Sequence, residues 1–186
     1  MLEAFLVSTG LVALAEIGDK TQLLSLVLAA RFRKPWPIVL GIFASTLLNH
    51  AVAAGLGAWI SRVVGELWMG RIAGISFLVM AAWILVPDKL DDAGVVEKPG
   101  HGVFITTAVL FFLAEMGDKT QVATVVLGAR YESLVAVVAG TTLGMMLANV
   151  PVVFFGDAIA KRVPVSVVRR VTAVAFALLG IFALLR

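Results

Sequence analysis

The chain has 186 residues and a formal net charge of +3; 61% of its residues are hydrophobic and 15% are charged. With a mean hydropathy of +1.03, so few charges cannot cover the surface of a soluble domain of this length. The composition therefore excludes a water-soluble globular protein and predicts an all-α integral membrane protein in a lipid bilayer, with no nucleic-acid partner. The lack of cysteine excludes disulfides and thiolate metal ligands.

Six apolar stretches along the chain are long enough to cross a membrane, which takes about 20 residues of helix. Their breaks carry proline, arginine, lysine and serine, and one extended polar stretch separates the third from the fourth. The predicted transmembrane helices cover residues 4–30, 37–60, 68–87, 103–129, 134–160 and 166–185.

The polar stretch separates two copies of one unit. A shift of 99 positions aligns residues 1–87 with 100–186 without a gap, and 23 of the 87 aligned pairs are identical. Because each half has three predicted spans, an odd number, the halves must lie in opposite orientations in the membrane. The sequence therefore predicts two inverted-topology three-helix repeats, 1–87 and 102–186, joined by a linker at 88–101. Inverted repeats are typical of transporters whose binding site lies near the bilayer midplane.

Lysine and arginine are unevenly distributed between the two predicted sides. The linker side carries nine, at Arg31, Arg33, Lys34, Lys89, Lys98, Lys161, Arg162, Arg169 and Arg170. The opposite side carries four, at Arg62, Arg71, Arg130 and Arg186. Since the side richer in these residues usually faces the cytoplasm, we expect a cytoplasmic linker and both termini outside.

The sequence Glu-x-Gly-Asp-Lys-Thr-Gln occurs at residues 16–22 and again at 115–121, about midway along the first and fourth predicted spans. A charge at that depth costs about 2.5–3.5 kcal/mol on insertion scales. At helical spacing the acids of each copy share one face, while the glycine permits close packing or local unwinding. Such faces form an all-oxygen site for a hard divalent cation. The expected metal ligands are Glu16, Asp19, Thr21, Gln22, Glu115, Asp118, Thr120 and Gln121.

Lys20 and Lys119 are expected to balance the charge of these acids. Four carboxylates and two ammonium groups leave two negative charges, which one divalent cation cancels. Without the ion, the buried site should take up protons, so exchange of one ion for about two protons follows, although sodium could serve instead. The alternative is an intrahelical glutamate–lysine pair that only neutralises buried charge, which leaves the duplicated aspartates unexplained.

Three more polar residues lie within predicted spans. Asn49 and His50 are in the second span, and His50 aligns with Asn149 in the fifth. They could support the motif acids as outer contacts, or form hydrogen bonds between helices.

With both motif copies in place, the chain resembles the GDT family of cation/proton exchangers, which includes bacterial manganese exporters and Golgi manganese/calcium transporters. The resemblance covers essentially the whole chain. It implies transport of manganese or calcium with the motif acids as ligands. The short linker resembles the bacterial members, which implies manganese export across the plasma membrane, the inner membrane of a bacterium.

Several functions are compatible with this sequence. The first is export of a divalent cation, most consistently manganese, in exchange for protons; a calcium/proton antiporter is the near alternative. The second is a passive channel for divalent cations, and the third is a membrane protein whose buried ion pairs only fix helix packing. The inverted repeat favours an exchanger. We expect no enzymatic activity and no cofactor beyond the transported ion, and the sequence does not indicate an oligomeric state.

Overall fold

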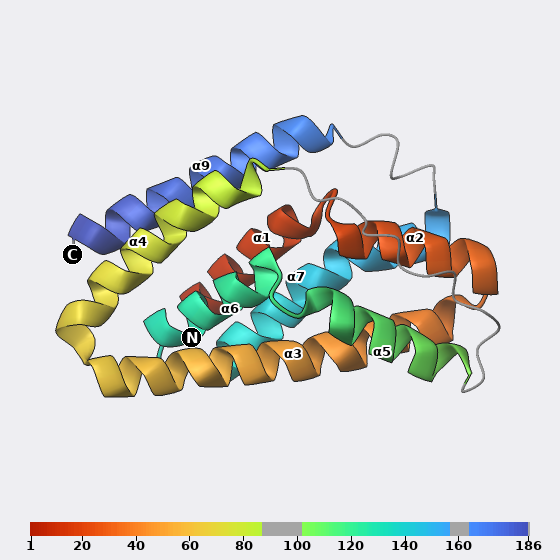
Figure 1. Cartoon of the computed structure of the whole chain (residues 1–186), viewed down its shortest axis with the longest axis horizontal. Helices are drawn as coiled ribbons and strands as arrows, with labels where there is room; N and C mark the ends of the chain where they lie inside the picture. Colours follow the sequence, from red (N-terminus) through yellow and green to blue (C-terminus); the bar gives the residue numbers. More distant parts are fainter. Residues whose placement is uncertain (87–101, 157–163, 186) are drawn as a thin grey trace.

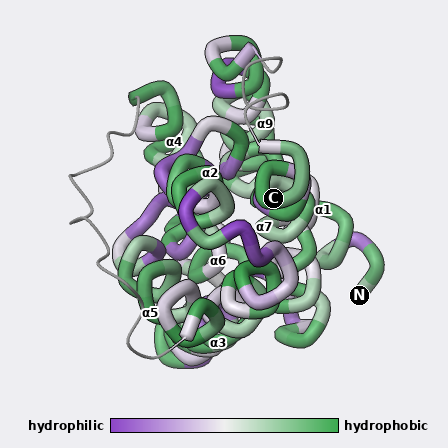
Figure 2. Tube along the Cα trace, turned by 90° about the vertical axis from the view of Figure 1, so that its right-hand side faces the viewer, coloured by the Kyte–Doolittle hydropathy of each residue, from purple (hydrophilic) through white to green (hydrophobic). Residues whose placement is uncertain are grey.

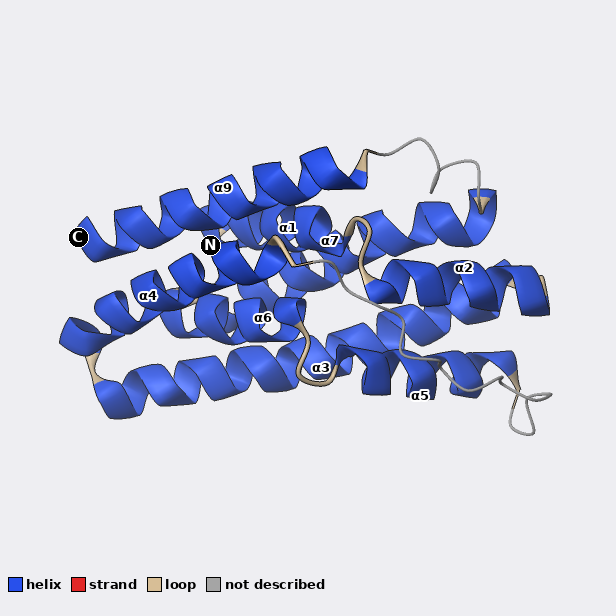
Figure 3. Ribbon diagram, turned by 45° about the horizontal axis from the view of Figure 1, so that its top comes forward, coloured by secondary structure: helices blue, strands red, loops and turns tan. Residues whose placement is uncertain are grey.

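A computed structural model of the chain describes residues 1–86, 102–156 and 164–185 (Figure 1). Within these ranges the regular structure is entirely helical, without a strand (Figure 3), which confirms the predicted all-α class. The predicted linker 88–101 lies outside the described residues.

The order of helices is the same in the two halves of the sequence. The first half contains α1 (Leu2–Glu16), α2 (Lys20–Phe32), α3 (Pro35–Val64) and α4 (Glu66–Ile84). The second half contains α5 (Val103–Glu115), α6 (Lys119–Arg130), α7 (Leu134–Phe155) and α9 (Val165–Leu185).

The first and fourth predicted spans, at 4–30 and 103–129, are not continuous helices. Each is interrupted at its motif, so that α1 and α5 end at the glutamate and α2 and α6 begin at the lysine. The glycines at the breaks, Gly18 and Gly117, have φ values of 82° and 71°, a left-handed conformation that only glycine adopts readily. The expectation that the motif acids share one helical face is therefore wrong, because the backbone changes direction between them.

The two broken helices run in opposite directions. In Figure 1, α1 and α2 lead from left to right, whereas α5 and α6 lead from right to left, and both breaks lie near the middle of the long axis. The same reversal holds for α3 against α7 and for α4 against α9.

Glycines set equivalent close contacts in the two halves. A Cβ atom at Gly41 of α3 would lie 2.9 Å from the carbonyl oxygen of Phe104 in α5. At the aligned position in α7, a Cβ on Gly140 would lie 2.6 Å from the carbonyl oxygen of Phe5 in α1. Because Phe5 and Phe104 are also aligned in the repeat, the central helix of each half packs in the same way against the broken helix of the other half.

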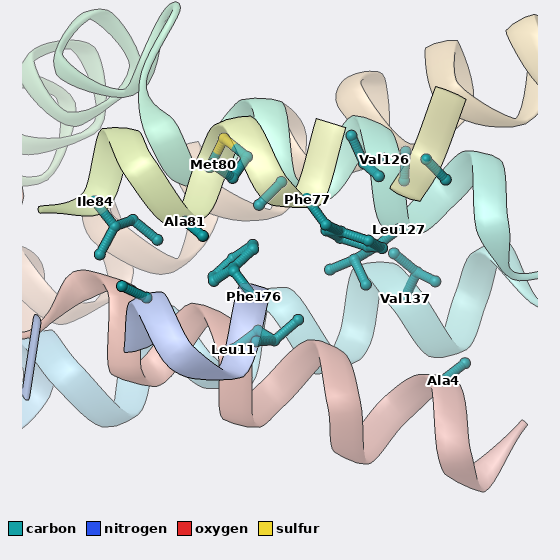
Figure 4. Close-up of a cluster of buried hydrophobic side chains, with 14 residues drawn as sticks. Ala4, Leu11, Phe77, Met80, Ala81, Ile84, Val126, Leu127, Val137 and Phe176 are labelled. Atoms are coloured by element: carbon teal, nitrogen blue, oxygen red, sulfur yellow. The ribbon is translucent and has the colours of Figure 1, made fainter. Parts of the chain in front are cut away.

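The last helices of the halves, α4 and α9, pack against each other. Phe77 of α4 and Phe176 of α9 occupy the same repeat position, and their ring centroids are 6.0 Å apart. Figure 4 shows these two rings facing each other in a core cluster that also contains Leu11 of α1 and Leu127 of α6.

Apolar side chains cover the outside of the protein. Hydrophobic residues predominate along the helices, and hydrophilic stretches are short (Figure 2). Large side chains such as Trp36, Phe155 and Val135 are 67%, 67% and 79% exposed, whereas the four motif carboxylates and a set of serine and threonine hydroxyls are buried. By length and composition, α3, α7 and α9 are each able to cross a membrane, and the apolar parts of α4 and α5 are shorter. This distribution suits lipid as the surrounding solvent.

Candidate cation site

The two aspartates of the motifs begin the second helix of each broken pair. Asp19 precedes α2, and its carboxylate accepts a hydrogen bond from the backbone N–H of Thr21 at 3.4 Å. Asp118 precedes α6 and accepts from the N–H and hydroxyl of Thr120 at 3.5 and 3.2 Å. Asp is a preferred residue at a helix N-terminus because it satisfies N–H groups that have no partner within the helix. Helix capping thus fixes both carboxylates at the breaks.

The motif glutamines stabilise the breaks. The side-chain oxygen of Gln22 accepts from the N–H of Gly18 at 2.9 Å, and that of Gln121 accepts from the N–H of Gly117 at 2.7 Å. Gln22 also donates to the carbonyl oxygen of Ala148 in α7 at 3.1 Å. These amide oxygens are therefore bonded to the backbone of the break, and Gln22 connects it to the other half.

Three motif carboxylates from both halves meet in the interior. Glu16, Asp19 and Asp118 each offer an oxygen atom, and these oxygens all lie within 4.8 Å of one another. The three side chains are at most 3% exposed. Glu16 accepts a hydrogen bond from the hydroxyl of Thr21, while its Oε1 atom is buried without a hydrogen-bond partner among the described residues. We call these three residues the carboxylate cluster.

The motif lysines lie beside the cluster. Lys20 forms an ion pair with Asp118, with 3.0 Å between Nζ and Oδ1, and so joins the first motif to the second. Lys119, which is 5% exposed, donates to the carbonyl oxygen of Val86 beyond α4 at 2.9 Å. The intrahelical glutamate–lysine pair considered from the sequence requires a continuous helix, and the helix is broken between Glu16 and Lys20.

Glu115, the fourth motif acid, has partners on α3. Its carboxylate accepts from the hydroxyl of Thr46 at 2.8 Å and from the side-chain amide of Asn49 at 3.0 Å. Asn49 also donates to the carbonyl oxygen of Phe112 at 3.2 Å. Asn49 is one of the polar residues predicted from the sequence, whereas Thr46 is not. The sequence did contain a signal for Thr46: it lies three residues before Asn49, a spacing that puts both side chains on one face of a helix.

The other two candidate polar residues lie apart from these contacts. Asn149 accepts from the hydroxyl of Ser25 at 2.7 Å and donates to the carbonyl oxygen of Met145 at 3.1 Å, so it connects α7 to α2. His50 is fully buried, and neither of its ring nitrogens has a hydrogen-bond partner among the described residues.

A small pocket opens next to the first break. It is lined by Gly18 and Asp19 at the break, by Ile84 at the end of α4, by Lys119, and by Arg169 of α9. The pocket brings a motif carboxylate and two basic side chains to one space. Leu14, Ala15 and Ile17 complete its lining.

The chemistry of the cluster is that of a hard cation site. Carboxylate and hydroxyl oxygens are the ligands that calcium, magnesium and manganese prefer. Buried carboxylates with an unsatisfied oxygen are unfavourable unless a cation or a proton compensates them. The site can therefore hold a divalent cation or protons, and the two would compete for the same oxygens.

Duplicated carboxylates buried at two helix breaks are typical of ion transporters. Sequence comparison identifies the family: residues 4–92 and 103–186 match the family described as divalent cation/proton antiporter GDT1, and the chain belongs to it. The resemblance predicted from the two motifs is confirmed.

Individual relatives agree with this assignment. A Vibrio cholerae protein named "Putative manganese exporter" is 49% identical over 182 residues, which cover 97% of this chain and 90% of the relative. GDT1-like protein sll0615 of Synechocystis sp. is 28% identical over 97% of this chain and 96% of its own length. GDT1-like protein 4 of Oryza sativa subsp. indica is 25% identical over 95% and 71%. No solved structure matches the chain.

Proposed function

We propose that this protein exports manganese across the plasma membrane in exchange for protons, with the carboxylate cluster as the transport site. The observation that carries the proposal is the meeting of Glu16, Asp19 and Asp118, from both motif copies, together with an Oε1 atom of Glu16 that has no hydrogen-bond partner among the described residues. Manganese is preferred because the most similar of the three relatives described above carries a name that refers to manganese export.

The proposal includes six membrane crossings in two inverted repeats. With 15 residues in α1 and 13 in α2, each helix is only about 20 Å long at about 1.5 Å per residue. Neither crosses a hydrocarbon core of about 30 Å alone, but together they do. The opposite directions of the two broken helices in Figure 1 support the inverted arrangement. Both breaks would then lie near the bilayer midplane, which is where inverted-repeat transporters bind their substrates.

Proton exchange follows from charge. The four motif carboxylates and two motif lysines leave two negative charges, which one divalent cation neutralises. After the ion leaves, protons are the available compensation in a region from which water is largely excluded. Each half-cycle would then carry either the metal or about two protons.

The experiment that tests this function is ion flux in liposomes containing the purified protein. We expect manganese uptake that is accelerated by an opposing proton gradient and abolished in Glu16→Gln, while Glu132→Gln, an exposed carboxylate between α6 and α7, keeps wild-type flux. A manganese flux that does not depend on the proton gradient would indicate a passive channel or sodium coupling. Flux of calcium in preference to manganese would identify a calcium/proton antiporter.

The proposed orientation places the linker in the cytoplasm and both termini outside. In Figure 1 the turn between α2 and α3, which carries basic residues, lies at the right, whereas the turns after α3 and α6 lie at the left. A single cysteine introduced into the linker should resist membrane-impermeant thiol reagents in intact cells. Ready labelling of that cysteine would reverse the orientation.

A further inference from the structure

The two motif glutamates have different partners although their local sequences are nearly the same. Glu16 is bonded to Thr21 of its own motif and contributes to the carboxylate cluster. Glu115 is bonded to Thr46 and Asn49, which belong to the central helix of the other half.

This difference is encoded in the two central helices. The repeat shift of 99 positions aligns Thr46 of α3 with Met145 of α7, and Asn49 with Ala148. Neither Met145 nor Ala148 has a side-chain hydrogen-bond donor. Because α3 packs on α5 as α7 packs on α1, the two pairs occupy equivalent places relative to their glutamates. Of the two motif glutamates, only Glu115 therefore has side-chain hydrogen-bond donors at these two positions of the facing helix.

We propose that Thr46 and Asn49 are positioning residues whose hydrogen bonds keep the Glu115 carboxylate away from the ion. Glu115 breaks these hydrogen bonds and contacts the ion only during translocation. Glu16 is then the glutamate that binds the ion at rest, and Glu115 is the exchangeable one. The inference rests on the proposed transport function and assigns separate roles to two residues of the same motif.

The surroundings of Glu115 fit such an exchange. Two donors, one a hydroxyl and one an amide, satisfy both carboxylate oxygens while the residue is away from the cluster. These two hydrogen bonds hold the carboxylate in place against α3 without a metal ion. Glu115 ends α5 at the break, and Asp118, a member of the carboxylate cluster, begins α6 at the same break. Glu115 thus lies next to the cluster without belonging to it.

The first test separates binding from transport. Equilibrium manganese binding and manganese flux are measured on the full-length protein, in detergent and in liposomes, for wild type, Glu16→Gln and Glu115→Gln. We expect Glu16→Gln to weaken binding by about 100-fold, because it loses a charged ligand of a buried ion. Glu115→Gln should change the binding constant by less than about threefold while slowing flux at least about tenfold, since its contact forms only during translocation.

The second test concerns the hydrogen bond from Thr46 to Glu115. Thr46→Val removes one donor at nearly constant volume, so Glu115 should spend more time at the ion. We expect manganese to bind about three- to tenfold more tightly and flux to slow by a similar factor. Thr46→Ser, which keeps the hydroxyl, should restore both values. The matched control is Thr142→Val in α7, whose buried hydroxyl has no partner among the described residues.

A double variant distinguishes positioning from structure. In a Glu115→Gln background, Thr46→Val should have no further effect on binding or flux, because the residue on which it acts is already neutral. Equal loss of binding in Glu16→Gln and Glu115→Gln, with wild-type transport intact, would overturn this inference alone. The inference would also be overturned if Thr46→Val and Thr142→Val had the same effect on manganese binding and flux. A wild-type protein that transports neither manganese nor calcium would overturn the proposed function together with it.

Discussion

The first and second motifs are nearly identical, since they share every residue but one. The variable position holds Ile17 in the first copy and Met116 in the second. Even so, the first copy contributes two acids to the carboxylate cluster and the second contributes one. The helices that face the motifs account for this difference, because only α3 presents donors to its glutamate. Two nearly identical motifs thus have different contacts because different side chains face them.

The largest expected effect comes from the one acid of the second motif that joins the cluster. Asp118→Asn removes a charged ligand and also leaves Lys20 without its partner in the ion pair. We expect manganese flux to fall by at least about 100-fold, while the protein stays folded in the membrane. The measurement is flux in liposomes, with folding checked by size-exclusion chromatography. Normal flux in this variant would remove Asp118 from the site.

The next prediction concerns pH. Protons and manganese compete for the same carboxylate oxygens, so the apparent affinity for manganese should fall as pH falls. If more than one proton is released per ion, the affinity should drop by more than about tenfold per pH unit in the titrating range. Binding measured from pH 5.5 to 8.5 tests this. An affinity that is flat with pH would exclude proton exchange.

Lys20 connects the motifs and should set this balance. In Lys20→Met the site loses one positive charge, so we expect it to bind manganese or protons more tightly and to release them more slowly. Flux should decrease by about three- to tenfold while affinity rises, because one ion pair in such surroundings amounts to roughly one to a few kcal/mol. Affinity that falls in this variant would show that the ammonium group supports the site in another way.

A graft can test whether the facing helix decides the role of a glutamate. Ala148→Asn places on α7 the donor that Asn49 provides on α3, and should draw Glu16 away from the cluster. Manganese should then bind about three- to tenfold more weakly, the effect of one hydrogen bond to a charged group. Ala148→Leu, of similar volume but without a donor, is the control. Equal effects of the two substitutions would attribute the loss to packing.

The smallest expected difference concerns the glycines at the breaks. A Cβ at Gly117 meets open space, so Gly117→Ala should cost only the left-handed conformation, about 1–2 kcal/mol of stability. A Cβ at Gly18 would also collide with the side chain of Val165 at the start of α9. Gly18→Ala should therefore lower the thermal unfolding temperature more than Gly117→Ala. Adding Val165→Ala should recover part of that difference.

Much of the fold is visible in the sequence. The run of apolar residues in α3, α7 and α9 predicted helices whose positions agree with the structure to within a few residues, because length and hydropathy alone determine them. Local unwinding at the motif glycines was one of two alternatives from the sequence, but the first and fourth spans were drawn as continuous because apolar residues lie on both sides of each motif. The local signal was present, since a glycine followed by an aspartate is a common way to end one helix and begin another.

The acidic residues of the candidate site could be named from the sequence, but their contacts could not. The duplicated acids identified the residues, and the ends of α1 and α5 place all four near the middle of the protein. The separate partners of Glu16 and Glu115 depend on which side chains of α7 and α3 face them. Helix packing between the halves decides that, and a single sequence does not specify it.

The contact between Phe77 and Phe176 carries a consequence for how the two halves of the chain can assemble. In a symmetric dimer of identical subunits, a residue on the twofold axis meets its own copy. These two rings occupy one position of the repeat and meet each other between α4 and α9. The contact is therefore the kind that two separate half-length chains would form at a symmetric interface. A gene cut within the linker and expressed as two halves should reassemble through this interface.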